Sequence, residues 1–222
     1  MIHIKKGREP MELIRYKKEK FAYYEGMPKG VKEAVKISLL EEQGYLCAYC
    51  MRRILPDTMT IEHYNCQSDV SEQEALDYRI MLGVCLGNRG TKEHRVTKDE
   101  MICDAHRGND PLKVNPQKAS DISLIRYNGM GIIDSDDTDI EKDVDKTLNL
   151  NCKIISLPEN RRRALIALKV YLKKQQGKGL WKKSLLEKIK KIIENPDEKG
   201  WKQEYSGILL YYLDKQLKKP VT

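Results

Sequence analysis

Four cysteines constrain the fold of this chain more than any other feature of its sequence. Cys47 and Cys50 form a Cys-x-x-Cys pair, and this spacing lets two thiolates from one turn reach a single metal ion. A structural zinc ion needs two further soft ligands, and Cys85 and Cys103 are the natural candidates because both lie near turns and flank a polar insertion. The sequence therefore predicts a closed zinc knuckle, whose role is folding rather than chemistry.

Other readings of the cysteines remain open at this point. The second pair is split by the polar segment 86–102 instead of two residues, so Cys66 or His106 could replace one of its members as a ligand. Cys47 and Cys50 could instead form a redox pair, but no thioredoxin-like βαβ pattern surrounds them.

Composition limits the class of protein. The chain has 222 residues, of which 40% are hydrophobic and 33% charged, a balance that suits one large soluble domain or one domain with extensions. It has no run of about 18 apolar residues that could span a membrane, and its opening residues lack the apolar stretch of a signal peptide. We therefore expect a cytoplasmic protein, in which six cysteines favour metal binding or catalysis over disulfides.

Positive charge is concentrated in the last third of the chain. Residues 153–222 contain 18 Lys and Arg against 7 Asp and Glu, a net charge of +11, whereas the remainder carries 23 against 26, a net charge of −3. Such a basic region can attract a polyanion such as nucleic acid. The alternative is a set of solvated helix faces.

The predicted organisation has three parts. Residues 1–30 form an N-terminal arm, 31–118 a central domain with the knuckle, and 119–222 a mainly helical region. In the central domain a helix is predicted over 31–43, ended by Gly44, and a strand over 58–63. The C-terminal region is expected to contain three helical segments, the first opening at Pro158, the second spanning 180–194, and the third following Pro196.

The acidic stretch 132–145 partly resembles a calcium-binding loop. Its sixth position from Asp134 should be glycine but is Asp139, and its twelfth should be glutamate but is Asp145. A solvated acidic turn is therefore the preferred interpretation.

The residues that can carry chemistry surround the cysteines. Glu62 and His63 end the predicted strand, where a neutral imidazole could deprotonate water and the carboxylate could hold a hard divalent ion. Asp104, His106 and Arg107 follow Cys103 and add a second carboxylate, a second imidazole and a cation. Water activation, a metal on the phosphate oxygens and a cation to orient phosphate are what hydrolysis of a phosphodiester requires.

These strings together resemble the HNH endonuclease family. The resemblance is carried by Leu46 to Met51, by Glu62-His63, by the segment from Tyr78 to Cys85, and by Cys103-Asp104 with Arg107-Gly108-Asn109. It is closest to the branch formed by PtuB, the HNH subunit of Septu antiphage systems that is also found with some retrons. This branch is further indicated by Met81-Leu82-Gly83-Val84-Cys85, by Thr147 to Asn151, and by Arg161-Arg162. The resemblance covers most of the chain, although only residues 45–116 bear on nuclease chemistry.

The resemblance implies an α+β protein with a small ββα-metal nuclease core. In that core His63 would be the general base, Glu62 and Asp104 would hold a catalytic Mg²⁺ or Mn²⁺ ion, and Arg107 and His106 would contact phosphate or nucleic acid. It also implies antiviral defence as the role, a PtuA-like ATPase subunit as partner, a homodimer as one arrangement within the larger complex, and DNA ahead of RNA as target.

Two departures from the HNH pattern bear on activity. The central asparagine of the motif should fall near Ile80, which cannot form side-chain hydrogen bonds, and Asn65 or Asn88 would have to replace it. Cys66 stands where a proline is common. A catalytically weakened, zinc-stabilised module that binds nucleic acid or protein is therefore the alternative function. A stand-alone reader of nucleic acid, such as a sensor of modified DNA, is a third.

Overall fold

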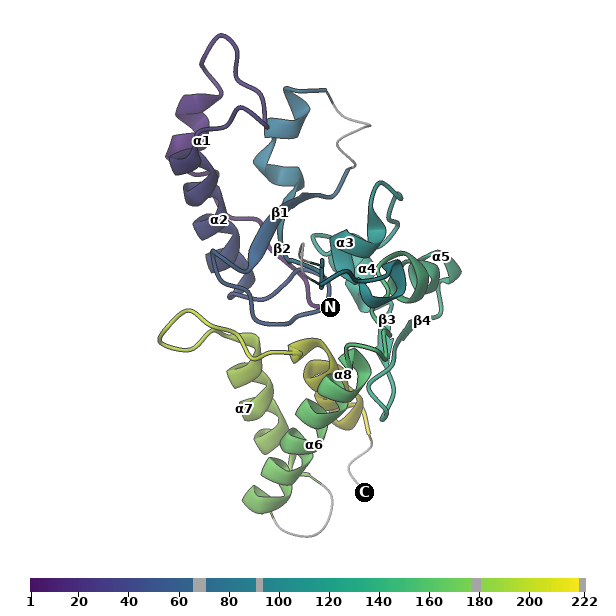
Figure 1. Ribbon diagram of the computed structural model, residues 1–222. Helices are drawn as coiled ribbons and strands as arrows, with labels where there is room; N and C mark the ends of the chain where they lie inside the picture. The colour runs from purple at the N-terminus through teal and green to yellow at the C-terminus, as the bar shows by residue number, and fades with distance from the viewer. Residues whose placement is uncertain (66–70, 91–93, 177–180, 220–222) are drawn as a thin grey trace.

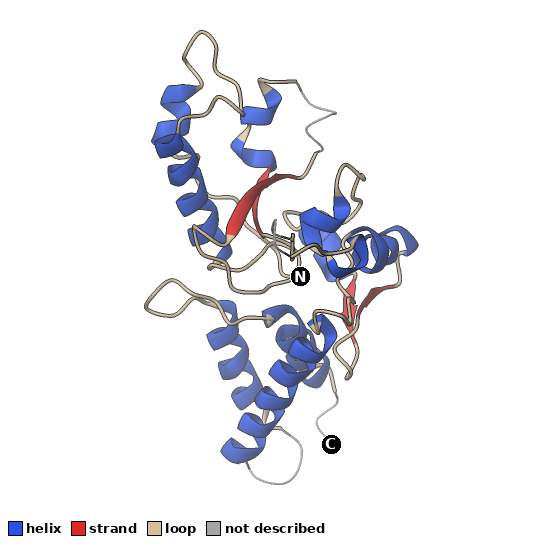
Figure 2. Ribbon diagram, viewed as in Figure 1, coloured by secondary structure: helices blue, strands red, loops and turns tan. Residues whose placement is uncertain are grey.

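The computed structural model describes residues 1–65, 71–90, 94–176 and 181–219, and shows an α+β chain with two small sheets (Figures 1 and 2). The α+β class expected from the sequence is confirmed at this level. The helices are α1 (Met11–Tyr16), α2 (Lys29–Gln43), α3 (Cys103–Arg107), α4 (Ala119–Ser123), α5 (Thr138–Lys142), α6 (Leu157–Gln176), α7 (Lys183–Glu194) and α8 (Ser206–Leu217). The strands are β1 (Met59–His63), β2 (Met81–Cys85), β3 (Ile125–Tyr127) and β4 (Ile133–Ser135). Short 3-10 turns η2 (Glu74–Leu76), η3 (Tyr78–Ile80) and η4 (Lys98–Glu100) and a π turn η5 (Asp143–Thr147) complete the order.

Helix α2 forms where the apolar spacing predicted it. Pro28 precedes its first residue, and Gly44 ends it with a left-handed φ of 63°, a conformation that costs glycine little. Val35, Leu39 and Leu40 are buried on one face of the helix, and that face packs against the sheet formed by β1 and β2. The predicted helix over 31–43 and its end at Gly44 are thus confirmed.

Strands β1 and β2 form an antiparallel ribbon that runs from the cysteines to the candidate catalytic residues. Met59 pairs with Cys85 at one end, and His63 pairs with Met81 at the other. The side chain of Gln43 fastens the middle of the ribbon to α2, because its Nε2 donates to the Gly83 carbonyl at 2.7 Å and its Oε1 accepts from the Gly83 amide at 2.7 Å. The short helix α3 then packs against β2.

The C-terminal region contains a hairpin and three longer helices. Helices α6, α7 and α8 lie together in the lower part of Figure 1, with α8 in contact with both of the others. The three helical segments expected there are present. The β3–β4 hairpin beside α8 was not predicted, since each of its strands has three residues and little sequence signal.

The acidic stretch serves capping and backbone contacts. Asp137 accepts hydrogen bonds from the first amides of α5, and the buried carboxylate of Asp143 accepts from the amides of Lys113 and Val114 at 2.6 and 2.8 Å. Asp145 accepts from the Asn151 side chain at 3.0 Å. Three of the carboxylates in the acidic stretch thus accept hydrogen bonds from the protein itself, and these bonds require no metal ion.

One continuous hydrophobic core joins the three predicted parts of the chain. It includes Met1 and Ile4 from the arm, Leu82 from β2 and Leu213 from α8. The start of the arm is tied to the end of the central domain, since the Ile4 amide donates to the Pro116 carbonyl at 2.8 Å. Among the described residues, no helix combines the length and the apolar composition needed to cross a membrane.

Candidate functional site

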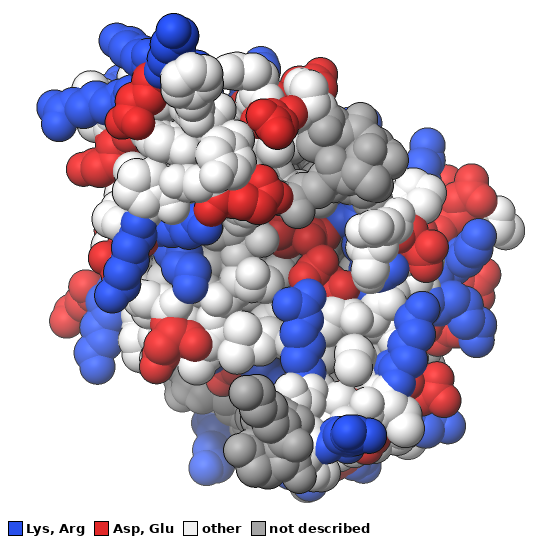
Figure 3. Space-filling model, turned by 45° about the horizontal axis from the view of Figure 1, so that its top comes forward, with Lys and Arg blue, Asp and Glu red and all other residues white. Residues whose placement is uncertain are grey.

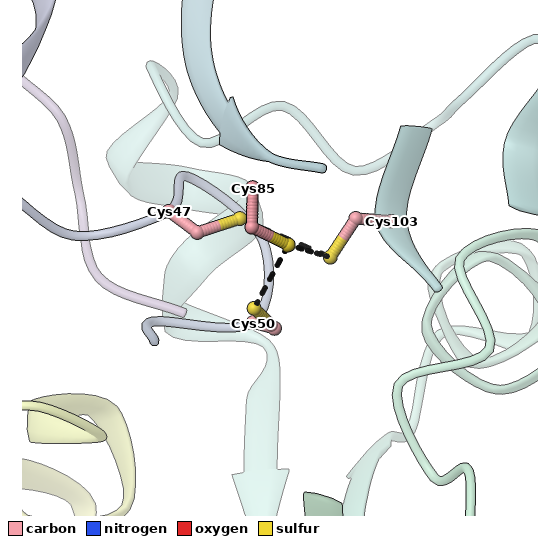
Figure 4. Close-up of side chains that lie close together, drawn as sticks. All are labelled: Cys47, Cys50, Cys85 and Cys103. Carbon is pink, nitrogen blue, oxygen red and sulfur yellow. Dashed lines mark hydrogen bonds between the residues drawn. The ribbon is translucent and has the colours of Figure 1, made fainter. Parts of the chain in front are cut away.

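The four predicted cysteines meet in one buried cluster (Figure 4). Cys47 and Cys50 come from the turn after α2, Cys85 is the last residue of β2, and Cys103 is the first of α3. Sulfur atoms of Cys47 and Cys103 are 3.8 Å apart, those of Cys50 and Cys85 are 3.7 Å apart, and those of Cys85 and Cys103 are 3.8 Å apart. A tetrahedral zinc ion with Zn–S bonds of about 2.3 Å requires sulfur separations of about 3.8 Å. The cluster could therefore hold one metal ion, as the sequence predicted.

The backbone around the cluster adopts uncommon conformations that bring the sulfurs together. Met51, directly after the pair, has a φ of 63°, and Cys103 has a φ of 54°. Such left-handed conformations cost a residue with a side chain about 1–2 kcal/mol each and persist only where the surroundings fix them. For Cys103 the amide donates to the Leu148 carbonyl at 2.9 Å.

Electrostatics favour a cation in the cluster. Burial, followed by contact with the other three sulfurs, raises the pKa of the Cys103 thiol well above its ordinary value. Without a cation the cluster therefore retains thiol protons that a divalent ion would displace, because metal ligation requires thiolates. The alternative ligand His106 is not in the cluster, since its Nδ1 lies 3.0 Å from the Thr147 carbonyl oxygen. Cys66 lies outside the described residues.

Glu62 and His63 end strand β1, and both are buried, with 7% and 5% of their surfaces exposed. The Oε1 atom of Glu62 accepts hydrogen bonds from the Tyr49 hydroxyl at 3.2 Å and from the Arg107 guanidinium. Neither contact uses Oε2. Burial first, and then the contact with Asp104, raises the pKa of Glu62 to about 8, against the opposing effect of Arg107. Asp104 is thus close enough to Glu62 to oppose ionisation of the Glu62 carboxyl group.

Arg107 was predicted to contact phosphate, but in the structure its guanidinium donates hydrogen bonds to acceptors within the protein. Only 2% of its surface is exposed. Besides Glu62, its guanidinium donates to the carbonyls of His63 at 3.2 Å, Tyr64 at 2.8 Å and Asp110 at 2.7 Å. These bonds tie the end of β1 to the end of α3. In this arrangement Arg107 orients Glu62.

The imidazole of His63 is fixed from two sides. Its Nε2 lies 2.8 Å from the Ala75 carbonyl oxygen, which can only accept, so Nε2 carries the proton and Nδ1 is the basic nitrogen. The Tyr24 ring packs edge-on against it, with ring centroids 4.4 Å apart. Burial lowers the pKa of His63 below the ordinary 6.5. The imidazole is therefore neutral at pH 7, the state that a general base requires.

Asp104 is the second residue of α3 and faces the same region. Its Oδ2 accepts from Arg89 at 2.7 Å, and the Arg89 side chain is about half exposed. A cavity of about 370 Å³ lies over these groups. It is lined by Tyr24, Thr60, Ile61, Glu62, His63, Arg89, Asp104, Ala105, Arg107, Gly108 and Asn109. The structure thus brings Glu62, His63 and Asp104 onto one cavity, whereas His106 is not among its lining residues.

Positive and negative side chains are mixed on the face of the molecule drawn in Figure 3. Figure 3 shows Lys and Arg side chains intermingled with Asp and Glu over the drawn face, with acidic side chains near its middle. Within the part of the chain that the structure describes, the four cysteines are the only group of three or more His, Cys, Asp or Glu residues close enough to form a ready-made metal cluster. Glu62 and Asp104 would need oxygens from water or a ligand to complete the coordination of an ion.

The position expected for the HNH asparagine has a backbone role here. Ile80 lies across the ribbon end from Tyr64, whose amide donates to the Ile80 carbonyl at 2.8 Å. Of the two possible replacements, Asn65 is exposed, and Asn88 donates through Nδ2 to the Glu100 carbonyl at 2.9 Å. Neither lines the cavity.

Sequence reasoning missed Tyr24, Tyr49 and Arg89. Tyr24 lies in the N-terminal arm, far in sequence from His63, and no local pattern connects the two. Tyr49 occupies one of the two positions between Cys47 and Cys50. The cysteine spacing says nothing about the residues between the ligands, so the hydroxyl of Tyr49 was overlooked.

Compared with known proteins, the chain matches no protein-family model, and no curated protein matches it significantly.

Proposed function

We propose that this protein is a metal-dependent nuclease of the HNH type that hydrolyses phosphodiester bonds. The observation that carries the proposal is the convergence of Glu62, His63 and Asp104 on one cavity, from the end of β1 and the first turn of α3. The antiparallel ribbon β1–β2 followed by α3 has the element order that a ββα nuclease core requires. The cysteine cluster beside it is proposed to hold a structural zinc ion.

The protein's own groups suit activation of water. The neutral imidazole of His63 has its Nε2 proton committed to Ala75, so Nδ1 can accept a proton from a water molecule. Burial keeps this nitrogen unprotonated at pH 7. The edge contact with Tyr24 prevents the ring from turning away.

The two carboxylates suit a hard divalent ion. Oε2 of Glu62 takes no part in the contacts with Tyr49 and Arg107, and burial together with the proximity of Asp104 raises the pKa of Glu62, so a divalent ion beside this carboxyl group would favour its ionised form. Mg²⁺ or Mn²⁺ is commonly held by one or two carboxylates, with water and phosphate oxygens as the other ligands. Such an ion would polarise the phosphate and stabilise the leaving oxygen.

Arg89 is the cation placed to meet a phosphate. Unlike Arg107, it is about half exposed, and its single described ion pair is with Asp104. An ion that takes over Asp104 would release Arg89 toward the substrate. In this proposal Arg107 orients the glutamate while Arg89 binds the anion.

The biological setting is also part of the proposal. The sequence resemblance supports an effector of a Septu-like antiphage complex, with a PtuA-like ATPase subunit as its partner. Co-expression with a PtuA-like ATPase subunit, followed by size-exclusion chromatography, tests this. Separate elution of the two subunits would contradict it.

Cleavage by the purified protein tests the chemistry. Plasmid DNA, a single-stranded oligonucleotide and total tRNA would be incubated with Mg²⁺ or Mn²⁺, with and without the ATPase. We expect cleavage that His63→Ala abolishes without changing the zinc content. His106→Ala is the matched control, because this histidine bonds to Thr147 outside the cavity, and it should cleave at the parental rate. Cleavage by His63→Ala at that rate would refute the assignment of the base.

The runner-up is a zinc-stabilised binding module that has lost catalysis. The observation that favours it is that Arg107 and Arg89 already neutralise Glu62 and Asp104, in a site where Ile80 replaces the HNH asparagine. Folded, zinc-loaded protein that cleaves none of the substrates with either metal would favour this alternative. Ile80→Asn would then be the first variant to test for restored cleavage.

A further inference from the structure

A second concave surface lies in the C-terminal region, away from the candidate active site. It is formed by α7 and the segment that joins α7 to α8, drawn as the loop that extends below α2 in Figure 1. The cavity measures about 620 Å³. It is lined by Arg53, Lys188, Lys191, Ile192, Ile193, Asn195, Pro196, Asp197, Trp201, Lys202 and Gln203, and we call it the α7 groove. It shares no lining residue with the cavity over His63.

Positive charge dominates the α7 groove. Arg53, Lys188, Lys191 and Lys202 line it, and Asp197 is the one acidic residue among the described lining residues. The Oδ1 atom of Asp197 already accepts hydrogen bonds from the amides of Lys199 and Trp201 at 3.0 and 2.8 Å. The groove therefore presents a surplus of cations.

Two of these lysines are available to a ligand. Lys188 and Lys191 are exposed, lie three residues apart on α7 and so share one helix face. Within the described part of the chain, neither forms a salt bridge. Their neighbour Lys190, in contrast, pairs with Asp214 at 2.6 Å and with Glu194 at 3.6 Å.

The groove also offers apolar surface held in a fixed position. Trp201 is partly exposed, with the Arg53 guanidinium carbon 4.6 Å from its ring centroid and the Tyr45 ring 5.9 Å away. The backbone beside it is anchored, since Arg53 donates to the Lys202 carbonyl at 2.6 Å and the Lys202 amide donates to the Gly44 carbonyl at 3.0 Å. Ile192 is 59% exposed.

We propose that the α7 groove binds single-stranded nucleic acid. Lysine side chains attract the phosphates, and the partly exposed indole ring with its aliphatic neighbour offers a surface on which unpaired bases can stack. A duplex keeps its bases inside, so the apolar part of this surface favours a single strand. The groove would hold a strand at a distance from the cavity over His63, and binding there can be tested whether or not the protein cleaves.

Salt-dependent binding of a short labelled oligonucleotide tests the proposal. The full chain would carry His63→Ala to prevent cleavage, and Lys188→Gln/Lys191→Gln would be compared with Lys173→Gln/Lys174→Gln. The control removes the same charge from two exposed lysines at the end of α6, outside the groove. Each phosphate contact to a single strand contributes about 0.7 to the slope of log K against log salt. The groove variant should lower that slope by about 1.4. When salt is raised from about 50 to about 200 mM, the factor by which the binding constant falls should therefore be about sevenfold smaller for the groove variant than for the parent.

Equal weakening by both double variants would show attraction to overall charge and overturn the proposal, as would no weakening by the groove variant. A second readout follows Trp201 fluorescence in a Trp181→Phe background, where a bound oligonucleotide should quench the emission. Unchanged emission at saturation would exclude base stacking in the groove. Tighter binding of a duplex than of its single strand would exclude the single-strand preference, and separate DNA and RNA oligonucleotides identify the sugar.

Discussion

Replacement of Cys85 by serine is the most direct test of the proposed metal centre. Cys85 is buried at the end of β2, with its sulfur 3.7 Å from that of Cys50 and 3.8 Å from that of Cys103. Serine has nearly the same shape, but its hydroxyl stays protonated near pH 7 and is a harder and poorer ligand for zinc. The variant therefore removes one thiolate and leaves no large cavity.

The expected loss follows from the binding free energy of a structural zinc ion. A site of this kind contributes about 10–16 kcal/mol to folding. With four equivalent sulfurs, one ligand accounts for about 2.5–4 kcal/mol. For a chain of this size, each kcal/mol shifts the Tm by about 2–4 °C. We therefore expect the Tm to fall by about 5–16 °C if the ion is retained, and by more if it is lost.

Zinc content and thermal unfolding would be measured side by side. The matched control is Cys152→Ser, because Cys152 is also buried and free, yet its sulfur contacts the Asp99 carbonyl at 3.4 Å and lies outside the cluster. The parent and the control should each carry one zinc ion per chain, and Cys85→Ser should carry less. A folded Cys85→Ser protein with a full complement of zinc and the parental Tm would refute the ligand assignment.

Three further predictions concern the cavity. Arg107→Met should lower the free energy of unfolding by about 3–5 kcal/mol in urea titrations, since it leaves the acceptors on Glu62, His63, Tyr64 and Asp110 without their guanidinium donor, and a loss below about 1 kcal/mol would contradict this role. Because burial lowers the pKa of His63, cleavage should retain more than half of its full rate at pH 6.5 and be lost at lower pH. The stability contributed by this group is likewise fully present above pH 6.5 and lost as pH falls through the lowered pKa. A rate already halved at pH 6.5 or above would argue against His63 as the base. Mn²⁺ at 100 times its Kd should stabilise the protein by about 2.7 kcal/mol, raising the Tm by about 5–11 °C, and an equal rise in Asp104→Asn would place the ion elsewhere.

Local patterns predicted the elements that local physics determines. The helix over 31–43 carried an apolar stripe and a terminal glycine, and both the stripe and the end at Gly44 are found in α2. The strand predicted over 58–63 is found as β1, and the positions of Cys85 and Cys103 near turns on either side of the polar insertion selected them as partners for the first pair. These features depend on a few adjacent residues or on residue type alone.

Contacts between distant segments could not be predicted in this way. The pairing of Arg107 with Glu62 joins residues 45 positions apart, and whether a guanidinium faces substrate or a buried carboxylate depends on how α3 packs against the ribbon. The place of Tyr24 over His63 depends on the path of the N-terminal arm, whose sequence shows no sign of a catalytic role. Without homologous sequences, only the three-dimensional structure could reveal these roles.

The cysteine cluster and the cavity over His63 are coupled through the same elements. Cys85 pairs with Met59 at one end of the ribbon, and His63 pairs with Met81 at the other, while Cys103 directly precedes Asp104 in α3. A metal ion bound to Cys85 and Cys103 would thus fix the ribbon relative to α3, and with it the separation of Glu62 and Asp104. Because a shift of about 1 Å at a catalytic group can lower a rate on the order of 100-fold, removal of such an ion should reduce the proposed cleavage even in molecules that remain folded.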